Sequence, residues 1–152
     1  MTTTTSAPPV LGSLDIDEFG IQIKFLATGE STAGAYTALR YRLPGRRAGA
    51  PPHYHKKTTE SFYVLEGRLT MLRGGQWVTV DPGTMVTILP GEVHGFRNDY
   101  EDAVTFLGFA SPAGIEKFLT GLVELVRAAG EWPPKDPSLL AKYGQWHDNF
   151  YL

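Results

Sequence analysis

Short runs of strand-forming residues, interrupted by glycine and proline, constrain the fold of this chain most strongly. The sequence has 152 residues, among them 17 glycines and 11 prolines. The runs between them are rich in Val, Thr, Tyr, Phe and Leu, which favour strands. Many short strands joined by turns are typical of a β-sandwich or barrel. We therefore expect an all-β fold, with strands over residues 22–27, 35–43, 61–66, 69–73, 76–80, 85–89, 94–98 and 103–110.

Two turn signals separate strand-like runs by gaps of hairpin size. They are Glu66-Gly67-Arg68 and Arg73-Gly74-Gly75-Gln76. No internal repeat is visible at the period of a solenoid or a duplicated half, so we expect a single barrel.

The pattern changes to helical after Ser111. Ser111 and Pro112 predict an N-cap and a first helical position, and Gly130 predicts the end of this helix. A second short helix is expected to open at Asp136-Pro137 and to end at Gly144. The apolar positions that define the first helix recur at helical spacing: Ile115, Phe118, Leu119, Leu122, Val123 and Val126. We divide the chain into a flexible N-terminal arm (1–14), a barrel (15–110) and C-terminal helices with an aromatic tail (111–152).

Composition excludes several classes of protein. Lys and Arg number 14 and Asp and Glu number 16, a net charge of −2, so a nucleic-acid partner is not expected. No apolar run approaches the ~20 residues that span a bilayer, and no leader pattern is visible, so we expect no membrane association and a cytoplasmic location. The absence of cysteine excludes disulfides, thiolate nucleophiles and thiolate metal ligands. Any metal must be held by nitrogen and oxygen.

Three of the four histidines lie in two short motifs. His53 and His55 are two residues apart, so in a strand both point to one side. Glu60 shares its parity with Phe62 and Val64, and a carboxylate on an apolar face is costly unless it is paired or metal-bound. His94 adds a third imidazole after a Pro-Gly turn. Three imidazoles and a carboxylate suit one divalent transition metal ion per chain; Fe, Mn, Ni, Co, Zn and Cu are not distinguished.

These motifs resemble those of the cupin superfamily. The first cupin motif is matched by His53, His55, Glu60 and Gly67 at the required spacings, with Arg47 in place of its opening glycine. The second is matched by Gly83, Gly91, His94 and Asn98, with its proline displaced by one position to Pro90. The resemblance covers roughly residues 35–110. It implies a cupin jelly-roll β-barrel, here followed by a two-helix extension, with His53, His55, Glu60 and His94 as metal ligands.

Within this superfamily the chain looks like the quercetin-dioxygenase-like branch, from the runs 61–67 and 93–98. The resemblance implies a metal-dependent dioxygenase that acts on an enol or a phenolic aromatic small molecule. In that reading Glu60 is both ligand and catalytic proton acceptor. Phe62 and Phe96 lie two residues beyond Glu60 and His94 on the same faces, and are the expected walls of the substrate pocket.

Two other classes of function stay open. Similar small cupins act without oxidation, as isomerases or as cyclases of polyketide-like intermediates. A third reading is a non-catalytic cupin that binds a small molecule, which would gain ground if the pocket held no metal. The sequence gives neither the metal nor the substrate and its regiochemistry, and it does not decide between oxidative and non-oxidative chemistry.

Three further features have less specific interpretations. We expect a homodimer, because Tyr63 and Leu65 are apolar at outward-facing positions and the first helix has a wide apolar stripe. His147 reads as a surface histidine, and whether the aromatic tail closes the site is left open. A basic excess reads as a solvated face or as steering for an anionic substrate: Arg40, Arg42, Arg46, Arg47, Lys56 and Lys57.

Overall fold

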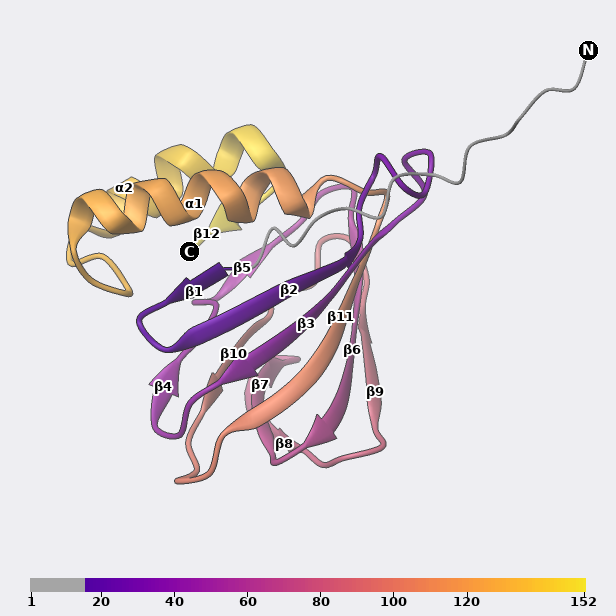
Figure 1. Cartoon of the computed structure of the whole chain (residues 1–152), viewed down its shortest axis with the longest axis vertical. Coiled ribbons are helices and arrows are strands. Elements are labelled where there is room, and N and C mark those ends of the chain that lie inside the picture. Colours follow the sequence, from indigo (N-terminus) through magenta and orange to yellow (C-terminus); the bar gives the residue numbers. More distant parts are fainter. Residues whose placement is uncertain (1–15) are drawn as a thin grey trace, which may run out of the picture.

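A computed structural model describes residues 16–152, so the predicted arm over residues 1–14 lies outside the described residues. Two sheets face each other, and two helices lie together at one end of them (Figure 1). The six-stranded sheet has the order β1-β2-β3-β11-β6-β9, which are Ile16–Glu18, Ile21–Ala27, Thr37–Leu43, Val104–Ser111, Thr59–Glu66 and Met85–Ile88. The four-stranded sheet has the order β4-β10-β7-β8, which are Arg47–Ala48, Gly95–Asn98, Leu69–Arg73 and Gln76–Val80. A short pair joins β5 (His53–Tyr54) to β12 (Phe150–Tyr151). The expected all-β architecture with a two-helix extension is confirmed.

Alternation of side chains decides which face of each strand enters the core. On β6, Glu60, Phe62 and Val64 are buried, whereas the residues between them are partly exposed. On β3, Leu39, Tyr41 and Leu43 are buried, and the arginines between them are exposed. The inward faces of the two sheets meet in one core, in which Tyr41 stacks on Phe106 with ring centroids 5.0 Å apart. The predicted parity of Glu60 with its apolar neighbours is confirmed.

The two predicted turns behave differently. Gly74 and Gly75 both adopt positive φ, 57° and 77°, and join β7 to β8 as a two-residue hairpin. Gly67 also has positive φ, but the strands that it joins, β6 and β7, belong to different sheets. This turn is therefore a crossing between sheets and not a hairpin. A Cβ at Gly67 would lie 2.4 Å from the Ala103 carbonyl oxygen, so only glycine fits there.

The first helix begins later than the sequence predicts. Helix α1 spans Ile115–Ala129 with Gly114 at its N-cap, and Ser111 is the last residue of β11, so the predicted Ser111 cap is wrong. Ser111 uses its hydroxyl for the Ala35 carbonyl. The predicted end at Gly130 is confirmed, with φ 76° in the left-handed region. Helix α2 spans Pro137–Gly144 as expected, capped by the Asp136 side chain, and a 3₁₀ turn follows over Gln145–His147.

A buried carboxylate fastens α1 to the barrel. Glu116 accepts hydrogen bonds from the Gly29 N–H at 2.7 Å, from the Gly114 N–H at 2.9 Å and from the Thr37 hydroxyl. Burial by itself raises the pKa of Glu116, but these hydrogen bonds outweigh it and hold the pKa below its ordinary value. The apolar stripe of α1 is then buried within its own chain, through Phe118, Leu119, Leu122 and Val126.

No helix among residues 16–152 is long and apolar enough to cross a membrane.

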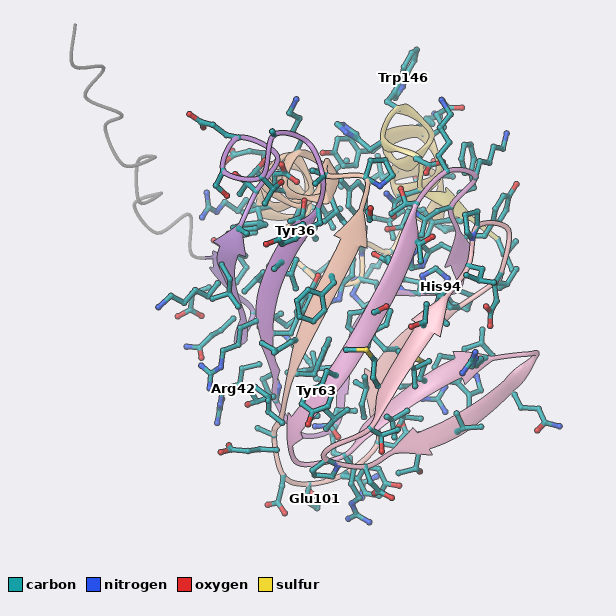
Figure 2. The ribbon with its side chains drawn as sticks, turned by 90° about the vertical axis from the view of Figure 1, so that its right-hand side faces the viewer. Tyr36, Arg42, Tyr63, His94, Glu101 and Trp146 are labelled. Carbon is teal, nitrogen blue, oxygen red and sulfur yellow. The ribbon has the colours of Figure 1, made fainter. Side chains whose placement is uncertain are left out.

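Tyr63 lies on the outer face of the six-stranded sheet, as does Arg42 of β3 (Figure 2). Leu65 and Met85 are exposed on the same face, at 38% and 54%. Two observations led to the expectation of a homodimer. The outward-facing apolar residues are present, but the apolar stripe of α1 packs against the barrel of its own chain and is not free for a partner.

The homodimer stays a prediction that light scattering tests. We expect the mass of two chains at micromolar concentration, and Leu65→Lys with Met85→Lys should shift it toward one chain, because like charges would face each other across a two-fold axis. A monomeric mass for the unaltered protein would overturn the expectation.

Glu116→Gln should lower the free energy of unfolding by about 1–3 kcal/mol at pH 7, because a carboxylate that accepts three hydrogen bonds is replaced by an amide. Since the folded pKa is lowered, this stabilisation is present above the ordinary pKa of 4.5 and is lost as the pH falls through the lower folded pKa. Urea unfolding of both proteins at pH 7 and pH 3 measures this. If the difference in unfolding free energy between the two proteins is as large at pH 3 as at pH 7, the charge of Glu116 contributes nothing to stability.

Candidate metal centre

The structure brings the four residues predicted as ligands into one buried cluster. His53, His55, Glu60 and His94 each offer an atom, and these atoms all lie within 4.8 Å of one another. They come from β5, the loop after it, β6 and the residue before β10. His53 and His94 are placed by a backbone bridge in which each N–H donates to the other's carbonyl at 2.9 Å. All four residues are at most 6% exposed.

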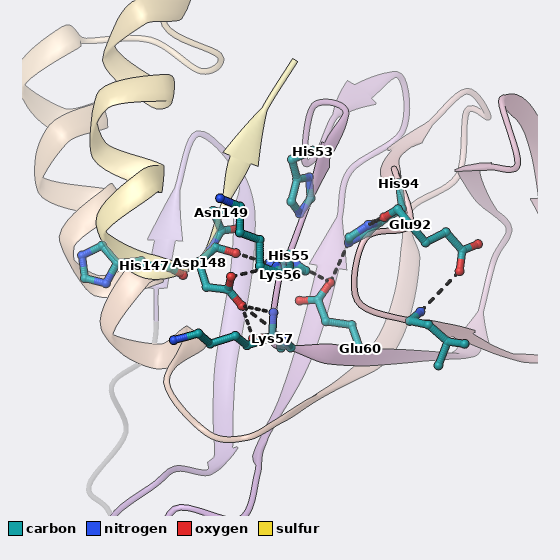
Figure 3. Close-up of polar contacts among 12 residues, drawn as sticks. His53, His55, Lys56, Lys57, Glu60, Glu92, His94, His147, Asp148 and Asn149 are labelled. Carbon is teal, nitrogen blue, oxygen red and sulfur yellow. Dashed lines mark hydrogen bonds and ion pairs between the residues drawn. The ribbon is translucent and has the colours of Figure 1, made fainter.

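Each imidazole is oriented by a backbone carbonyl. Nδ1 of His53 lies 2.7 Å from the Pro51 oxygen, and Nδ1 of His94 lies 2.9 Å from the Glu92 oxygen. Nδ1 of His55 lies 2.6 Å from the oxygen of Asp148. A carbonyl only accepts, so each Nδ1 carries the proton and the Nε2 atoms are left for the centre of the cluster (Figure 3).

The Nε2 atoms and Glu60 face each other as metal ligands do. Oε2 of Glu60 lies 2.8 Å from Nε2 of His94 and 3.1 Å from Nε2 of His55. Although it is close to Glu60, Nε2 of His55 makes no hydrogen bond of acceptable geometry and is a buried, unsatisfied atom. Such an atom is costly unless something else binds it. Three neutral nitrogens and one carboxylate fit a divalent transition metal ion, which would satisfy His55 as well.

At His53 and at Glu60 the electrostatics favour the protonation state that a metal ligand needs. Burial, followed by the neighbouring His94, lowers the pKa of His53 to about 3, so its imidazole is neutral. Burial alone would raise the pKa of Glu60, but the facing imidazoles of His55 and His94 outweigh burial and keep the carboxylate ionised. Burial lowers and the Glu60 carboxylate raises the pKa of His55, and the carboxylate prevails. The cluster is therefore an ionised carboxylate among imidazoles.

A cavity of about 110 Å³ adjoins the cluster, and His53 and Glu60 belong to both. It runs between the inner face of the six-stranded sheet and α1, whose Phe118, Leu122 and Val126 line it. Phe62 and Phe96, the predicted pocket walls, also line it, and their ring centroids are 5.9 Å apart. Its lining is almost wholly apolar, and no lysine or arginine is among the residues of 16–152 that form it.

Three residues of the site were not predicted. Tyr41 and Tyr151 line the cavity close enough to Glu60 for its charge, after burial, to raise the pKa of both phenols. Tyr41 could have been found from its parity with Leu39 and Leu43. Asp148 holds the ring of His55 across 93 positions, and no local pattern signals such a contact.

His147 lies away from the cluster. Its ring packs against Phe118 and Tyr143, with centroids 6.0 Å and 4.9 Å apart. Figure 3 shows it beside the helices, on the far side of Asp148 from Glu60. The aromatic tail does reach the site, but through Asp148, Asn149 and Tyr151 and not through His147.

Two facing sheets with three inward imidazoles and a carboxylate beside an apolar cavity are the arrangement of a cupin-type β-barrel with a candidate metal site. Residues 39–109 match the Cupin domain family, which supports membership of the cupin superfamily. It resembles a quercetin 2,3-dioxygenase of Bacillus subtilis, with 36% identity over 70 residues. That match covers 46% of this chain but only 20% of the relative.

Solved structures show the same fold. A predicted oxalate decarboxylase from Thermotoga maritima superposes with a TM-score of 0.58 and 20% identity, covering 66% of this chain and 91% of the other. A sugar phosphate isomerase from Silicibacter pomeroyi superposes with a TM-score of 0.53 and 23% identity, covering 62% and 61%. These likenesses confirm the expected cupin jelly roll.

His53→Ala or His94→Ala should reduce the bound metal from near one ion per chain to near zero, because each removes a nitrogen from a four-ligand set. Plasma mass spectrometry of protein made without added metal measures this, and circular dichroism checks that the barrel is folded. His147→Ala is the matched control and should keep its metal. Full occupancy in either cluster variant would contradict the ligand assignment.

Proposed function

We propose that this chain is a metal-dependent cupin enzyme, a dioxygenase that acts on an enol or phenolic small molecule. The proposal rests on the observation that two residues of the cluster also line the cavity. His53 and Glu60 present polar atoms to a space whose lining is mostly apolar. A substrate in that space would place one oxygen at the cluster and its hydrocarbon body among the aromatic walls.

The charge of the cavity favours an uncharged substrate. Among residues 16–152, the charged side chains that line it are those of Glu18 and Glu60, both acidic. Anions such as oxalate or a sugar phosphate would lie there without a lysine or arginine partner, and burying an unpaired charge is costly. The basic residues Arg40 and Arg42 are exposed on the opposite face of β3 and do not line the cavity. This favours an enol or phenol over the anions named for the two structural neighbours.

Glu60 is placed to take the substrate proton. Its carboxylate is ionised and lies at the boundary of cluster and cavity, and an enol or phenol gives up a proton as its oxygen is bound. A divalent transition metal in the cluster would supply Lewis-acid polarisation of that oxygen and, for a redox-active ion, reactivity with dioxygen. Phe62, Phe96 and Phe118 exclude water from the same space.

The likeness to a quercetin 2,3-dioxygenase supports the oxidative reading over the other classes. A non-oxidative cyclase or isomerase of polyketide-like intermediates would use the same ligands with a redox-inert ion. A non-catalytic binding cupin would use the same cavity without turnover. Metal analysis and oxygen uptake with flavonol and diketone substrates separate the three. Oxygen uptake that depends on a redox-active ion supports the dioxygenase. If the zinc form converts the substrate without oxygen uptake, the non-oxidative cyclase or isomerase replaces the dioxygenase as the proposed function.

Glu60→Gln should keep part of the metal, because the amide oxygen still coordinates, but should lower turnover by about 10²–10⁴-fold through loss of the proton acceptor. Steady-state oxygen uptake, normalised to the metal bound, measures this. Glu66→Gln is the matched control, since Glu66 lies on the same strand but is exposed. Unchanged turnover per metal in Glu60→Gln would remove the proton-acceptor role.

A further inference from the structure

Two of the four cluster residues lie on a very short support. Strand β5 has only two residues, His53 and Tyr54, and His55 opens the loop that follows. The bridge to His94 holds His53 on one side. A two-residue strand has too few hydrogen bonds to fix its own side chains. Something else must hold this segment.

That support comes from the segment of residues 148–152, here named the β12 segment. Tyr151 pairs with His53 and Phe150 with Tyr54 in antiparallel register, and the Leu152 N–H donates to the Pro52 carbonyl at 3.3 Å. The Tyr151 ring lies beside the His53 ring, with centroids 5.4 Å apart. The β12 segment therefore runs along the whole of β5.

Asp148 holds the loop that follows His55. Its carboxylate accepts hydrogen bonds from the N–H groups of Lys56, Lys57 and Thr58, at 2.8, 3.0 and 3.1 Å, and from the Thr58 hydroxyl at 2.9 Å. Its backbone carbonyl accepts the Nδ1 proton of His55 at 2.6 Å. One residue thus fixes both the loop and the imidazole that the loop carries (Figure 3).

The backbone at Asp148 makes this double contact possible. Asp148 has φ 57° and ψ 31°, in the left-handed region, which asparagine, aspartate and glycine tolerate best. The next residue, Asn149, is 2% exposed, and its N–H donates to the Gly144 carbonyl at 3.0 Å. The β12 segment is thereby tied to the end of α2.

We propose that the β12 segment belongs to the metal centre, with Asp148 as a positioning residue that holds His55 with its Nε2 toward Glu60 and His94. The proposal rests on the metal-dependent function above. A ligand histidine that donates its other N–H to a fixed acceptor has its tautomer and ring orientation set before metal arrives. Removing such an outer partner costs typically about 10–100-fold in metal affinity.

Two variants of Asp148 separate its carboxylate from its backbone. Asp148→Gly tolerates the left-handed backbone and keeps the carbonyl that accepts from His55, but it removes all four hydrogen bonds that hold this carbonyl against the loop carrying His55. Asp148→Asn keeps one acceptor oxygen and should have an intermediate effect. Glu116→Gln is the matched control: it also alters a carboxylate that accepts backbone and hydroxyl hydrogen bonds, but none of its partners belongs to the cluster.

The measurement is the affinity for Co²⁺ by competition with a chelator, together with the visible absorption spectrum of the Co²⁺ form and the thermal stability of the metal-free protein. We expect about a 10–100-fold weaker affinity and an altered spectrum in Asp148→Gly. Glu116→Gln should keep the Co²⁺ affinity and the spectrum of the unaltered protein, even if it loses as much thermal stability as Asp148→Gly. That contrast distinguishes positioning from general destabilisation.

Two results would overturn the proposal, and they differ in scope. If the unaltered protein binds Co²⁺ but Asp148→Gly binds it equally well with the same spectrum, the positioning role fails and the proposed function is untouched. If the unaltered protein binds neither Co²⁺ nor Zn²⁺, the proposed function and this inference fail together. Should Asp148→Gly not fold, the same comparison with Asp148→Asn decides.

Discussion

A carboxylate buried among apolar side chains is the constraint around which this structure is organised. Glu60 lies on the inner face of β6, beside Phe62 and Val64 of the core, and it is 6% exposed. An ionised group there is stable only with partners that compensate its charge and its lost hydration. His55 and His94 supply them from segments that reach Glu60 from outside its own sheet. Nε2 of His55 is left without a hydrogen bond of acceptable geometry, and a metal ion in the cluster would bind it.

The imidazoles depend in turn on backbone geometry. Each donates Nδ1–H to a carbonyl: those of Pro51 and Glu92 lie two residues before their histidines, and that of Asp148 lies far along the chain. Gly49 shows how tightly the approach to β5 is packed, because a Cβ there would lie 2.4 Å from the Phe96 ring. The first motif has arginine where its opening glycine is usual, and Gly49 allows the close approach two positions later. The chain leading into β5 thus packs directly against Phe96, which lines the cavity.

What the sequence predicted correctly depends on local periodicity. Alternation along β6 placed Glu60 with Phe62 and Val64 on the core face, and the glycine pair 74–75 predicted its hairpin. The misses arise where a local signal competes with a distant contact. Ser111 and Pro112 have the residue types of a helix start, but Ser111 pairs with Thr59 and extends β11 instead. The β12 segment has only two strand residues, and its partner strand β5 lies about a hundred positions earlier. No short stretch of sequence contains both strands, so local patterns could not predict their pairing.

The separation of charge across β3 links the fold to the choice of substrate. Consecutive residues of a strand point to opposite faces, so Arg40 and Arg42 are committed to the outside by the same alternation that sends Leu39, Tyr41 and Leu43 inward. Moving either arginine to the cavity would require a slip of register along the whole strand, which would expose three core residues. Among residues 16–152 the cavity is therefore lined without a lysine or arginine, so an anion would depend on the positive charge of a metal in the cluster. An uncharged enol or phenol needs no such compensation until its proton has passed to Glu60.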